Sequence, residues 1–540
     1  MNEGRYKPSE RGNFMAIRLN GIFRDGAVLQ RGREIRIFGN ATAGSRVLVR
    51  LILDSKTIKT EARRGDATSD SDGYFVAVLP ELDEGGPYVL EVSCGDEKVT
   101  FSDIYVGDLW IAGGQDNMEM ALEKTEDYKD FVENWKDNKV HYYSVPVCGE
   151  FNEKFFEAED NSKWIKVTKR NAGKMPGVPF YFVNELRKKV DCHVGIIVCT
   201  ARGTSVASWQ SVEKLKETEE GQKYLDEFKA ECEGVSDEAF YEAEEEYNKE
   251  CADWEKAYKK IAKARPELND FETAKLAGEF PWPPPYGAPS YRRPGGLFET
   301  MVRRIAPVCV KGVVFYQGEE DCESHFGDYF VNFKAMIEDW RKVFDDEELF
   351  FVFAQLPMYI SRDRKYLGFE DFHWPKLRRQ QYLVSKRLGN TAMAALTDCG
   401  EFDNIHPLNK KIPGERLGKL ALKLVYGFED VKAVPPYPID VRRGESGLEI
   451  SFAGDFNMLS MAPTEESGFE IADEKSGFRP CLATVSFDGR TVELMSPYIP
   501  FPTRCRYAYF SYGSAPLKGD DNLAVLPFER SIVKNLDEEE

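Results

Sequence analysis

Five short apolar runs set the strongest limit on what this 540-residue chain can fold into. They lie between residues 108 and 398 and read DLWIAGG, HVGIIVCT, KGVVFYQG, ELFFVFAQLP and NTAMAALTD. Each run is nearly continuous in apolar residues and is bounded by turns, as expected of a strand buried on both faces. Helical stretches separate the runs, and strands that alternate with helices form a parallel sheet covered on both sides. The pattern therefore predicts an α/β domain with a parallel central sheet.

Two helical stretches carry the clearest signals. In residues 328–344 the apolar side chains recur at helical spacing, namely at Phe330, Phe333, Met336, Ile337, Trp340 and Phe344. Residues 415–427, ERLGKLALKLVYG, predict a second helix that stops at Gly427. Both helices belong to the α/β domain.

The chain divides into three predicted domains. Residues 1–107 hold short alternating runs separated by turn residues, which predicts an N-terminal β-sandwich. Residues 108–430 form the α/β domain, and residues 431–540, where the alternation returns, form a C-terminal β domain. Residues 211–290 interrupt the middle domain with a charged helical insertion and the start of a Pro-rich loop, FPWPPPYGAPSYRRPGG. The aromatic residues of this loop suit a carbohydrate cleft, although a plain connector is the favoured interpretation.

Charge and cysteine usage exclude several classes of function. The chain carries 72 Lys and Arg against 92 Asp and Glu, a formal charge of −20, which argues against nucleic acid as a partner. It contains no run of about 18 apolar residues, so no membrane span is expected. The eleven cysteines show no metal-ligand spacing, and no metal or cofactor is expected. The first residues lack the apolar core of a signal peptide, which predicts a cytoplasmic protein, or a secreted one if a leader has been removed.

Polar, turn-forming residues follow four of the five predicted strands. In chain order they are Gln115, Asp116 and Asn117; Arg202, Gly203, Thr204 and Ser205; Gln317, Glu319, Glu320 and Asp321; and Asp398, Asp403 and His406. Ligands of open parallel sheets bind beyond the carboxyl ends of the strands. We therefore expect these residues to form one composite site.

Asp403 and His406 form the sharpest element of this set. An Asp three residues before a His can accept a hydrogen bond from Nδ1 and leave Nε2 free, as in the base and orienter of a hydrolytic triad. No G-x-S-x-G elbow supplies a nucleophile. Ser205 is a candidate, but a hydroxyl that caps the following helix is the favoured interpretation.

At these residues the sequence resembles the sialate O-acetylesterase family, a branch of the SGNH hydrolases. The resemblance begins with IFRDGAVLQRGREIRIFGNATAGSRV, ends with RYAYFSYGSAPLKGDDNLAVLPFER, and includes VKGVVFYQGEED and DNIHPLNKKIPGERL. It implies a three-layer sandwich that hydrolyses O-acetyl esters on sugars, with sialic acid or acetylated plant glycans as substrates and no cofactor.

The resemblance also implies roles for individual residues. The residue at position 116 would attack the ester, His406 would move the proton, and Asp403 would orient His406. Gly203 and Gln317 would stabilise the oxyanion. The remaining positions of the same motifs, assigned to substrate binding or to bracing the loops, are Gln115, Asn117, Arg202 and Glu319.

Two of these positions depart from the family pattern. The first motif of the family reads G-Q-S-N-M, whereas here Asp116 stands in place of the serine nucleophile. The second motif usually carries two glycines before Thr204, whereas here Arg202 replaces the first of them. A carboxylate is a poor substitute for serine, because the tetrahedral intermediate would expel the carboxylate rather than the sugar alkoxide. Its charge also opposes the oxyanion of the transition state, and we expect it to pair with His406 and raise the pKa of that histidine.

Several explanations remain open at this stage. Asp116 is either an engineered replacement, a mark of a protein that binds carbohydrate without turnover, or a base that acts on water. Arg202 favours a natural change over a single engineered one, and it could pair with Asp116, grip an anionic substrate, or point to solvent. A structural protein that uses the acidic insertion as its contact is a third class of function.

Overall fold

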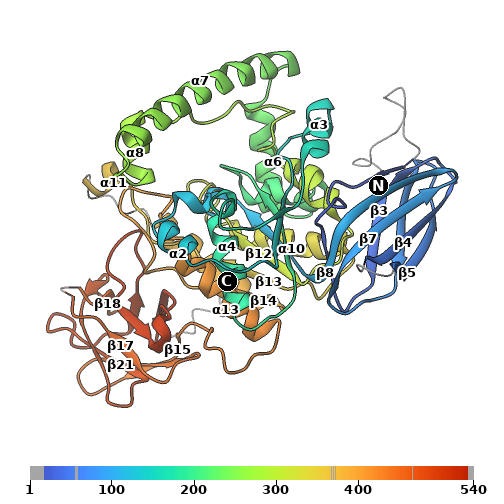
Figure 1. The fold of residues 1–540 in the computed structure, drawn as a ribbon. Helices are drawn as coiled ribbons and strands as arrows, with labels where there is room; N and C mark the ends of the chain where they lie inside the picture. Colours follow the sequence, from blue (N-terminus) through green and yellow to red (C-terminus); the bar gives the residue numbers. More distant parts are fainter. Residues whose placement is uncertain are drawn as a thin grey trace. The chain divides into compact units, whose positions relative to one another are not determined.

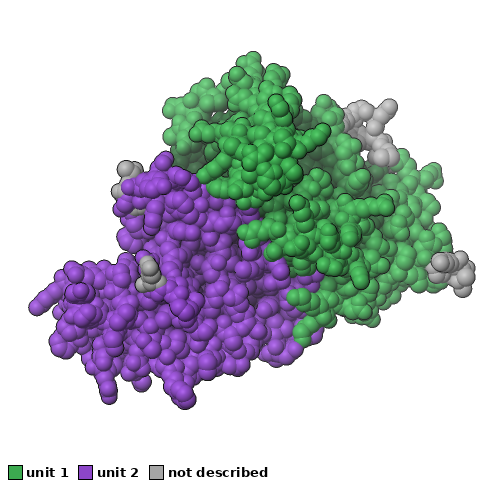
Figure 2. All heavy atoms as spheres, turned by 60° about the vertical axis from the view of Figure 1, so that its left-hand side comes forward, with its two compact units in different colours: residues 1–183, 187–315, 331–351 green, residues 184–186, 316–330, 352–540 purple. Residues whose placement is uncertain are grey.

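The computed structural model describes residues 17–54, 59–366, 368, 370, 372–464 and 466–532. The N-terminal residues on which the signal-peptide prediction rests, and the outer ends of both flanking domains, lie outside the described residues. The chain forms two compact units (Figure 2). Unit 1 comprises residues 1–183, 187–315 and 331–351, and unit 2 comprises residues 184–186, 316–330 and 352–540.

Most strands in the first part of unit 1 pair antiparallel, and the exception is the short strand Val28–Gln30, which pairs parallel with the strand Glu97–Gly114. A three-stranded sheet has the order β1, β3, β6 (Ile17–Leu19, Ile35–Ala41, Tyr74–Leu79). A second group contains β2, β4, β5 and β7 (Val28–Gln30, Arg46–Asp54, Lys59–Thr68, Gly85–Cys94). Alternate residues of β4, such as Val47, Val49 and Leu51, are fully buried, because successive side chains of a strand point to opposite faces. The alternating pattern therefore predicted β3, β4, β6 and β7 correctly, whereas β1, β2 and β5 lie outside the runs on which the prediction rested.

Strand β8 (Glu97–Gly114) links this part to the strands that follow (Figure 1). Its first half pairs antiparallel with β7, and its second half pairs parallel with β11 (Val194–Thr200). The predicted boundary after residue 107 therefore falls inside one continuous strand. On the far side of β11 lie β9 (Val140–Ser144) and the short edge strand β10 (Ile165–Lys166), and β12 (Gly312–Tyr316) adjoins β8.

Every residue of β11 and β12 is buried, as the continuous apolar runs predict. The helices around them are α1, α2, α3, α4 and α9 (Asp116–Glu119, Tyr128–Glu133, Glu153–Asn161, Gly177–Arg187, Arg303–Ile305). Helix α10 (Tyr329–Phe344) confirms the first helical prediction, since five of its six predicted core residues are buried and only Phe330 is half-buried.

The predicted insertion is mainly helical up to Ala277, and a loop without helix follows over residues 278–290. It contains α5, α6, α7 and α8 (Val212–Leu215, Glu219–Glu231, Asp237–Ala264, Asp270–Ala277), and α7 is the long helix of Figure 1. The side chain of Ser236 caps α7, and a reciprocal pair of hydrogen bonds between Asn269 and Glu272 caps α8. Tyr258 of α7 donates a hydrogen bond of 2.5 Å to Asp270 of α8, which fixes the turn between the two helices.

Unit 2 contains strand β14 (Thr391–Ala394), all but the first residue of strand β13 (Phe351–Ala354), and the helices α11, α12 and α13 (Arg362–Tyr366, His373–Arg387, Lys411–Leu424). Gly427 has φ +79° and its amide bonds to Lys423, so the predicted helix stop is confirmed.

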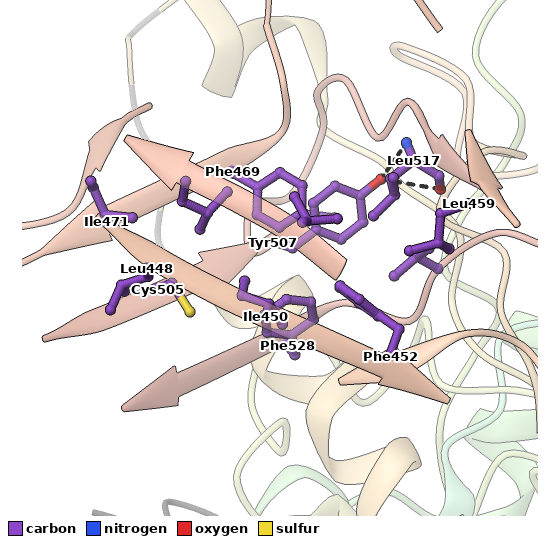
Figure 3. Packing of buried hydrophobic residues seen from close by; sticks show 14 of the residues in the cluster. Leu448, Ile450, Phe452, Leu459, Phe469, Ile471, Cys505, Tyr507, Leu517 and Phe528 are labelled. Atoms are coloured by element: carbon purple, nitrogen blue, oxygen red, sulfur yellow. Dashed lines mark hydrogen bonds between the residues drawn. The ribbon is translucent and has the colours of Figure 1, made fainter. Parts of the chain in front are cut away.

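The C-terminal part of unit 2 is β apart from the short 3-10 helix η6 (Asp520–Asn522). Its strands are β15, β16, β21 and β20 (Tyr437–Arg443, Leu448–Ala453, Thr491–Met495, Leu482–Val485) in one sheet, β19, β18, β22 and β24 (Arg479–Pro480, Phe469–Ala472, Arg504–Tyr507, Phe528–Ser531) in another, and the pair β17 and β23 (Leu459–Met461, Leu517–Gly519). Ile450, Phe452, Phe469 and Tyr507 meet in its core, where Tyr507 also bonds to the backbone of Leu517 (Figure 3).

The chain thus has a mixed α/β fold with a large mixed sheet and several antiparallel sheets. All five predicted strand runs contain a strand. None of the described helices is long and apolar enough to cross a bilayer.

Candidate functional site

Asp116 lies at the carboxyl end of β8, where the chain turns into α1. Because β8 and β11 are parallel neighbours, with Gly114 opposite Thr200, the residues that follow the two strands meet at one edge. The amide of Gly203 donates a hydrogen bond of 2.8 Å to Oδ2 of Asp116, and Nε of Arg202 lies 2.9 Å from Oδ1. Both carboxylate oxygens are therefore held by the loop after β11. The predicted pairing of Arg202 with Asp116 is confirmed, and the solvent-pointing alternative is wrong.

The groups around the ion pair of Asp116 and Arg202 stabilise the charged guanidinium. The side chain of Asp116 is only 9% exposed, so little water competes with Arg202 for it. Burial opposes the charge on Arg202, but the carboxylates of Asp116 and Glu119 raise the pKa of its guanidinium. The guanidinium also lies 4.8 Å from the centre of the Phe280 ring. Arg202 is therefore a permanent cation fixed between a carboxylate and an aromatic ring.

The Pro-rich loop contacts the same segment. Gly203 has φ +59°, and a Cβ built on it would lie 1.9 Å from Cη2 of Trp282. Nε of Arg292 donates a 2.8 Å hydrogen bond to the carbonyl of Gly203, and the hydroxyl of Tyr291 bonds to the carbonyl of Arg202 at 3.1 Å. A plain connector does not account for these contacts, which place the loop against the candidate site.

The other predicted residues of this unit have mainly supporting positions. Gln115 and Asn117 are buried on either side of Asp116. The hydroxyl of Thr204 donates to the carbonyl of Ala201 at 2.9 Å and accepts from the indole of a buried tryptophan, which makes it part of the core. Ser205 precedes the short helix η4 (Val206–Trp209), but its side chain makes no capping hydrogen bond, so the capping interpretation is wrong.

Gln317 lies in unit 2 and is held rigidly. Its side-chain amide donates to Asp321 at 2.5 Å, and its Oε1 accepts from the hydroxyl of Tyr329 at 2.8 Å. Gln381 bonds to its carbonyl at 3.1 Å. Glu319 is buried close by in the sequence, at 6% exposure. The oxyanion role of Gln317 and the bracing role of Glu319 remain predictions.

The loop that carries Asp403 and His406 is also in unit 2. Asp403 adopts φ +62°, and its two oxygens accept from the amide and from Nε of Arg362, at 2.9 and 3.1 Å. The amide of His406 bonds to the side chain of Asn404 at 3.1 Å, and Asn404 donates to Glu401 at 2.7 Å. The predicted orientation of His406 by Asp403, and its pairing with Asp116, remain predictions.

Arg362 is a functional candidate that the sequence did not reveal, since no motif links it to Asp403. Asp398 is the opposite case, because its position after a strand suggested a site residue. The structure shows a buried structural anion that accepts from Arg416 at 2.6 and 2.8 Å and pairs with Lys518 at 2.8 Å. Those cations hold the pKa of Asp398 well below its usual range against the effect of burial.

Within the described parts of the chain, no group of three or more His, Cys, Asp or Glu residues could hold a metal ion.

Comparisons with known proteins show which proteins this chain resembles. Residues 287–420 match the family model for "carbohydrate esterase, sialic acid-specific acetylesterase". The sialate O-acetylesterase of Homo sapiens is 25% identical over 488 residues, which cover 85% of this chain and 81% of the relative. The enzyme of Mus musculus is 23% identical over 461 residues, which cover 82% of this chain and 77% of the relative.

A solved structure shares the fold. A carbohydrate acetylesterase from Xanthomonas citri superposes with a TM-score of 0.72 at 24% identity, over 96% of this chain and 100% of that chain. The matched family segment contains Gln317, Glu319, Asp403 and His406 but begins after Asp116. The family model and the relatives therefore show that this chain is similar to the sialate O-acetylesterases.

Proposed function

We propose that this protein is a carbohydrate O-acetylesterase of the sialate O-acetylesterase type in which Asp116 and Arg202 suppress ester hydrolysis. The observation that carries the proposal is the pair of contacts on Asp116. One carboxylate oxygen accepts a hydrogen bond from the amide of Gly203, and the other forms an ion pair with the guanidinium of Arg202. The names of the relatives support an acetylated sugar as the ligand. An SGNH-type three-layer sandwich is the fold that goes with this assignment.

The contacts explain the suppression in physical terms. An amide aimed at the developing oxyanion is among the strongest sources of transition-state stabilisation in acyl transfer, worth about 10²–10³ in rate. Here the amide of Gly203 already donates to a carboxylate, so an acetyl oxygen would have to displace an anion to reach it. The ion pair with Arg202 also lowers the tendency of Asp116 to attack.

Attack by Asp116 would be unproductive even if it occurred. The new C–O bond gives a tetrahedral intermediate, and loss of the carboxylate from it regenerates the ester because a sugar alkoxide is the worse leaving group. The remaining route is attack by water on the acetyl carbon. In that route His406 takes the proton from water and passes it to the departing sugar oxygen, and acetate is released. This route lacks both a covalent intermediate and a free oxyanion donor, so we expect it to be slow.

A second candidate is a carbohydrate-binding protein without turnover. The same contacts favour it, because they close the reactive position while leaving the surrounding loops in place. The two candidates differ only in residual hydrolysis, which an assay measures directly.

The test is acetate release from p-nitrophenyl acetate and from O-acetylated sialic acid. The unmodified protein is compared with Asp116→Ser, with Arg202→Gly, and with the double variant. Asp116→Asn is the matched control, since it removes the charge without supplying a nucleophile. We expect Asp116→Ser to raise kcat/KM by about 10²-fold or more, because it supplies a hydroxyl nucleophile and frees the Gly203 amide. We expect the double variant to be the fastest, because it leaves no unpaired guanidinium.

The outcomes separate the alternatives. Equal rates for the unmodified protein and Asp116→Ser would overturn the proposed suppression and identify Asp116 as a catalyst in its own right. If the protein binds sugar and none of the variants hydrolyses the esters, the carbohydrate-binding protein is favoured.

A further inference from the structure

We propose that Trp282 is a stacking platform for the pyranose ring of the carbohydrate ligand, positioned beside Asp116 by Gly203 and Arg292. This inference rests on the proposed function, since it names the part of the ligand that the site recognises. Trp282 belongs to the Pro-rich loop and lies before residue 287, where the matched family segment begins.

The first step is the position of the indole. The far edge of the Trp282 ring lies over Gly203, where Cη2, Cζ2 and Cζ3 are 1.9, 2.3 and 3.1 Å from the place of a Cβ. Gly203 in turn donates its amide to Asp116. Only a residue without a side chain leaves room for the indole here. The backbone angle φ of +59° at Gly203 favours glycine as well. The ring is therefore in contact with the same residue that binds the carboxylate at the predicted reaction centre.

The second step is the fixation of the indole. The guanidinium of Arg292 lies 5.0 Å from the centre of the Trp282 ring and 5.6 Å from that of Tyr286. Nε of the same guanidinium is bound to the carbonyl of Gly203. One cation thus ties the tryptophan, a second aromatic ring and the loop after β11 together. A ring held in this way loses little conformational entropy when a ligand binds.

The third step is exposure. Trp282 remains 44% exposed although it is held on two sides. Tryptophan is highly buried on average, so a fixed and accessible indole is unusual. A pyranose ring presents a face of C–H groups, and the indole offers the largest flat apolar surface of any side chain for such a face. The hydroxyl and ester oxygens of the same sugar would then find polar partners at Arg202 and Asp116.

The experiment measures ligand binding by calorimetry, with O-acetylated sialic acid and acetylated xylo-oligosaccharide as the probes. Trp282→Ala is compared with Trp282→Phe, which keeps an aromatic face. Phe487→Ala is the control, because Phe487 is a fully exposed aromatic residue outside the candidate site. We expect Trp282→Ala to weaken the Kd of the bound sugar about tenfold, Trp282→Phe to weaken it less, and the control to leave it unchanged.

A second readout uses the Asp116→Ser background. There, Trp282→Ala should raise KM for the sugar ester and lower the ratio of its kcat/KM to that of p-nitrophenyl acetate by about tenfold, since the small ester has no sugar ring to stack. Unchanged Kd values in Trp282→Ala, or no binding of either sugar to the unmodified protein, would overturn the inference. An Asp116→Ser protein without esterase activity would count against the proposed function alone, because the binding experiment does not depend on turnover.

Discussion

Gly203→Ala tests the link between the reaction centre and the Trp282 platform most directly. The substitution adds one methyl group at a residue whose amide binds Asp116, and it leaves that amide in place. Its Cβ would lie 1.9 Å from Cη2 of Trp282, whereas ordinary contacts begin at 3.4 Å. The indole must therefore move by at least about 1.5 Å, the difference between these two distances.

The expected loss of stability has two parts. A side chain at φ +59° costs about 1 kcal/mol, as at any left-handed position. Displacing the indole from Arg292 removes a cation–π contact, worth about 0.5–1 kcal/mol at a partly exposed site. Gly234→Ala isolates the first part, because Gly234 has φ +80° and nothing within 4 Å of its Cβ position.

The assay is urea denaturation of the two alanine variants, each in the presence and absence of Trp282→Ala. When Trp282 is present, we expect Gly203→Ala to lower the free energy of unfolding by about 1 kcal/mol more than Gly234→Ala does. When Trp282 is replaced by Ala, we expect the two substitutions to lower it equally. The sugar Kd of Gly203→Ala should weaken as much as that of Trp282→Ala. Equal costs for the two glycines in both backgrounds, with sugar binding unchanged, would refute the idea that Gly203 positions the indole.

Three further predictions concern stability. Burial, aided by a neighbouring histidine, lowers the pKa of His141 to about 3, so below pH 6.5 the unfolded chain takes up a proton that the folded chain refuses. The contribution of neutral His141 to the free energy of unfolding is therefore full above pH 6.5 and is lost as the pH falls towards 3. The free energy of unfolding from urea titrations should drop between pH 7.5 and pH 5.0, and His141→Gln should make that drop about 2 kcal/mol smaller. Asp398→Ala should cost about 3–5 kcal/mol in the same titration at pH 7.5, because it leaves the buried guanidinium of Arg416 without its carboxylate, and a cost below 1 kcal/mol would contradict this. Tyr507→Phe should cost about 1–2 kcal/mol, because the amide of Leu517 loses its 2.9 Å acceptor in the core shown in Figure 3, and an unchanged urea midpoint would show that this bond adds nothing.

How far the sequence predicts the fold depends on how local the signal is. The runs of β11 and β12 are continuously apolar, and the capped, charged pattern of α7 is helical over its whole length, so their prediction needed no tertiary information. Strand β9 was not predicted, because VHYYS is short and mixes polar with aromatic residues. It is recognisable only through its pairing with β11.

The site divides in the same way. The motifs around Asp116 and His406 follow strands, and their positions could be read from the chain. The contact of Trp282 with Gly203 could not, because nothing local connects a Pro-rich loop to a turn in a distant part of the sequence. The same holds for the bonds from Arg362 to Asp403. Such contacts arise from tertiary packing, and only the structure supplies them.

Asp116 and Arg202, the two departures that the sequence analysis predicts, form one ion pair. Asp116 is 9% exposed, so removing Arg202 would take the cation away from a carboxylate that little water reaches. Such a carboxylate is costly without its cation, and Arg202, whose side chain is 44% exposed, supplies that cation. We infer that the two residues belong together, and that restoring serine alone leaves the loop with an unbalanced charge. Replacing both residues together should therefore raise the log rate by more than the sum of the two single changes, whereas two independent substitutions would give that sum.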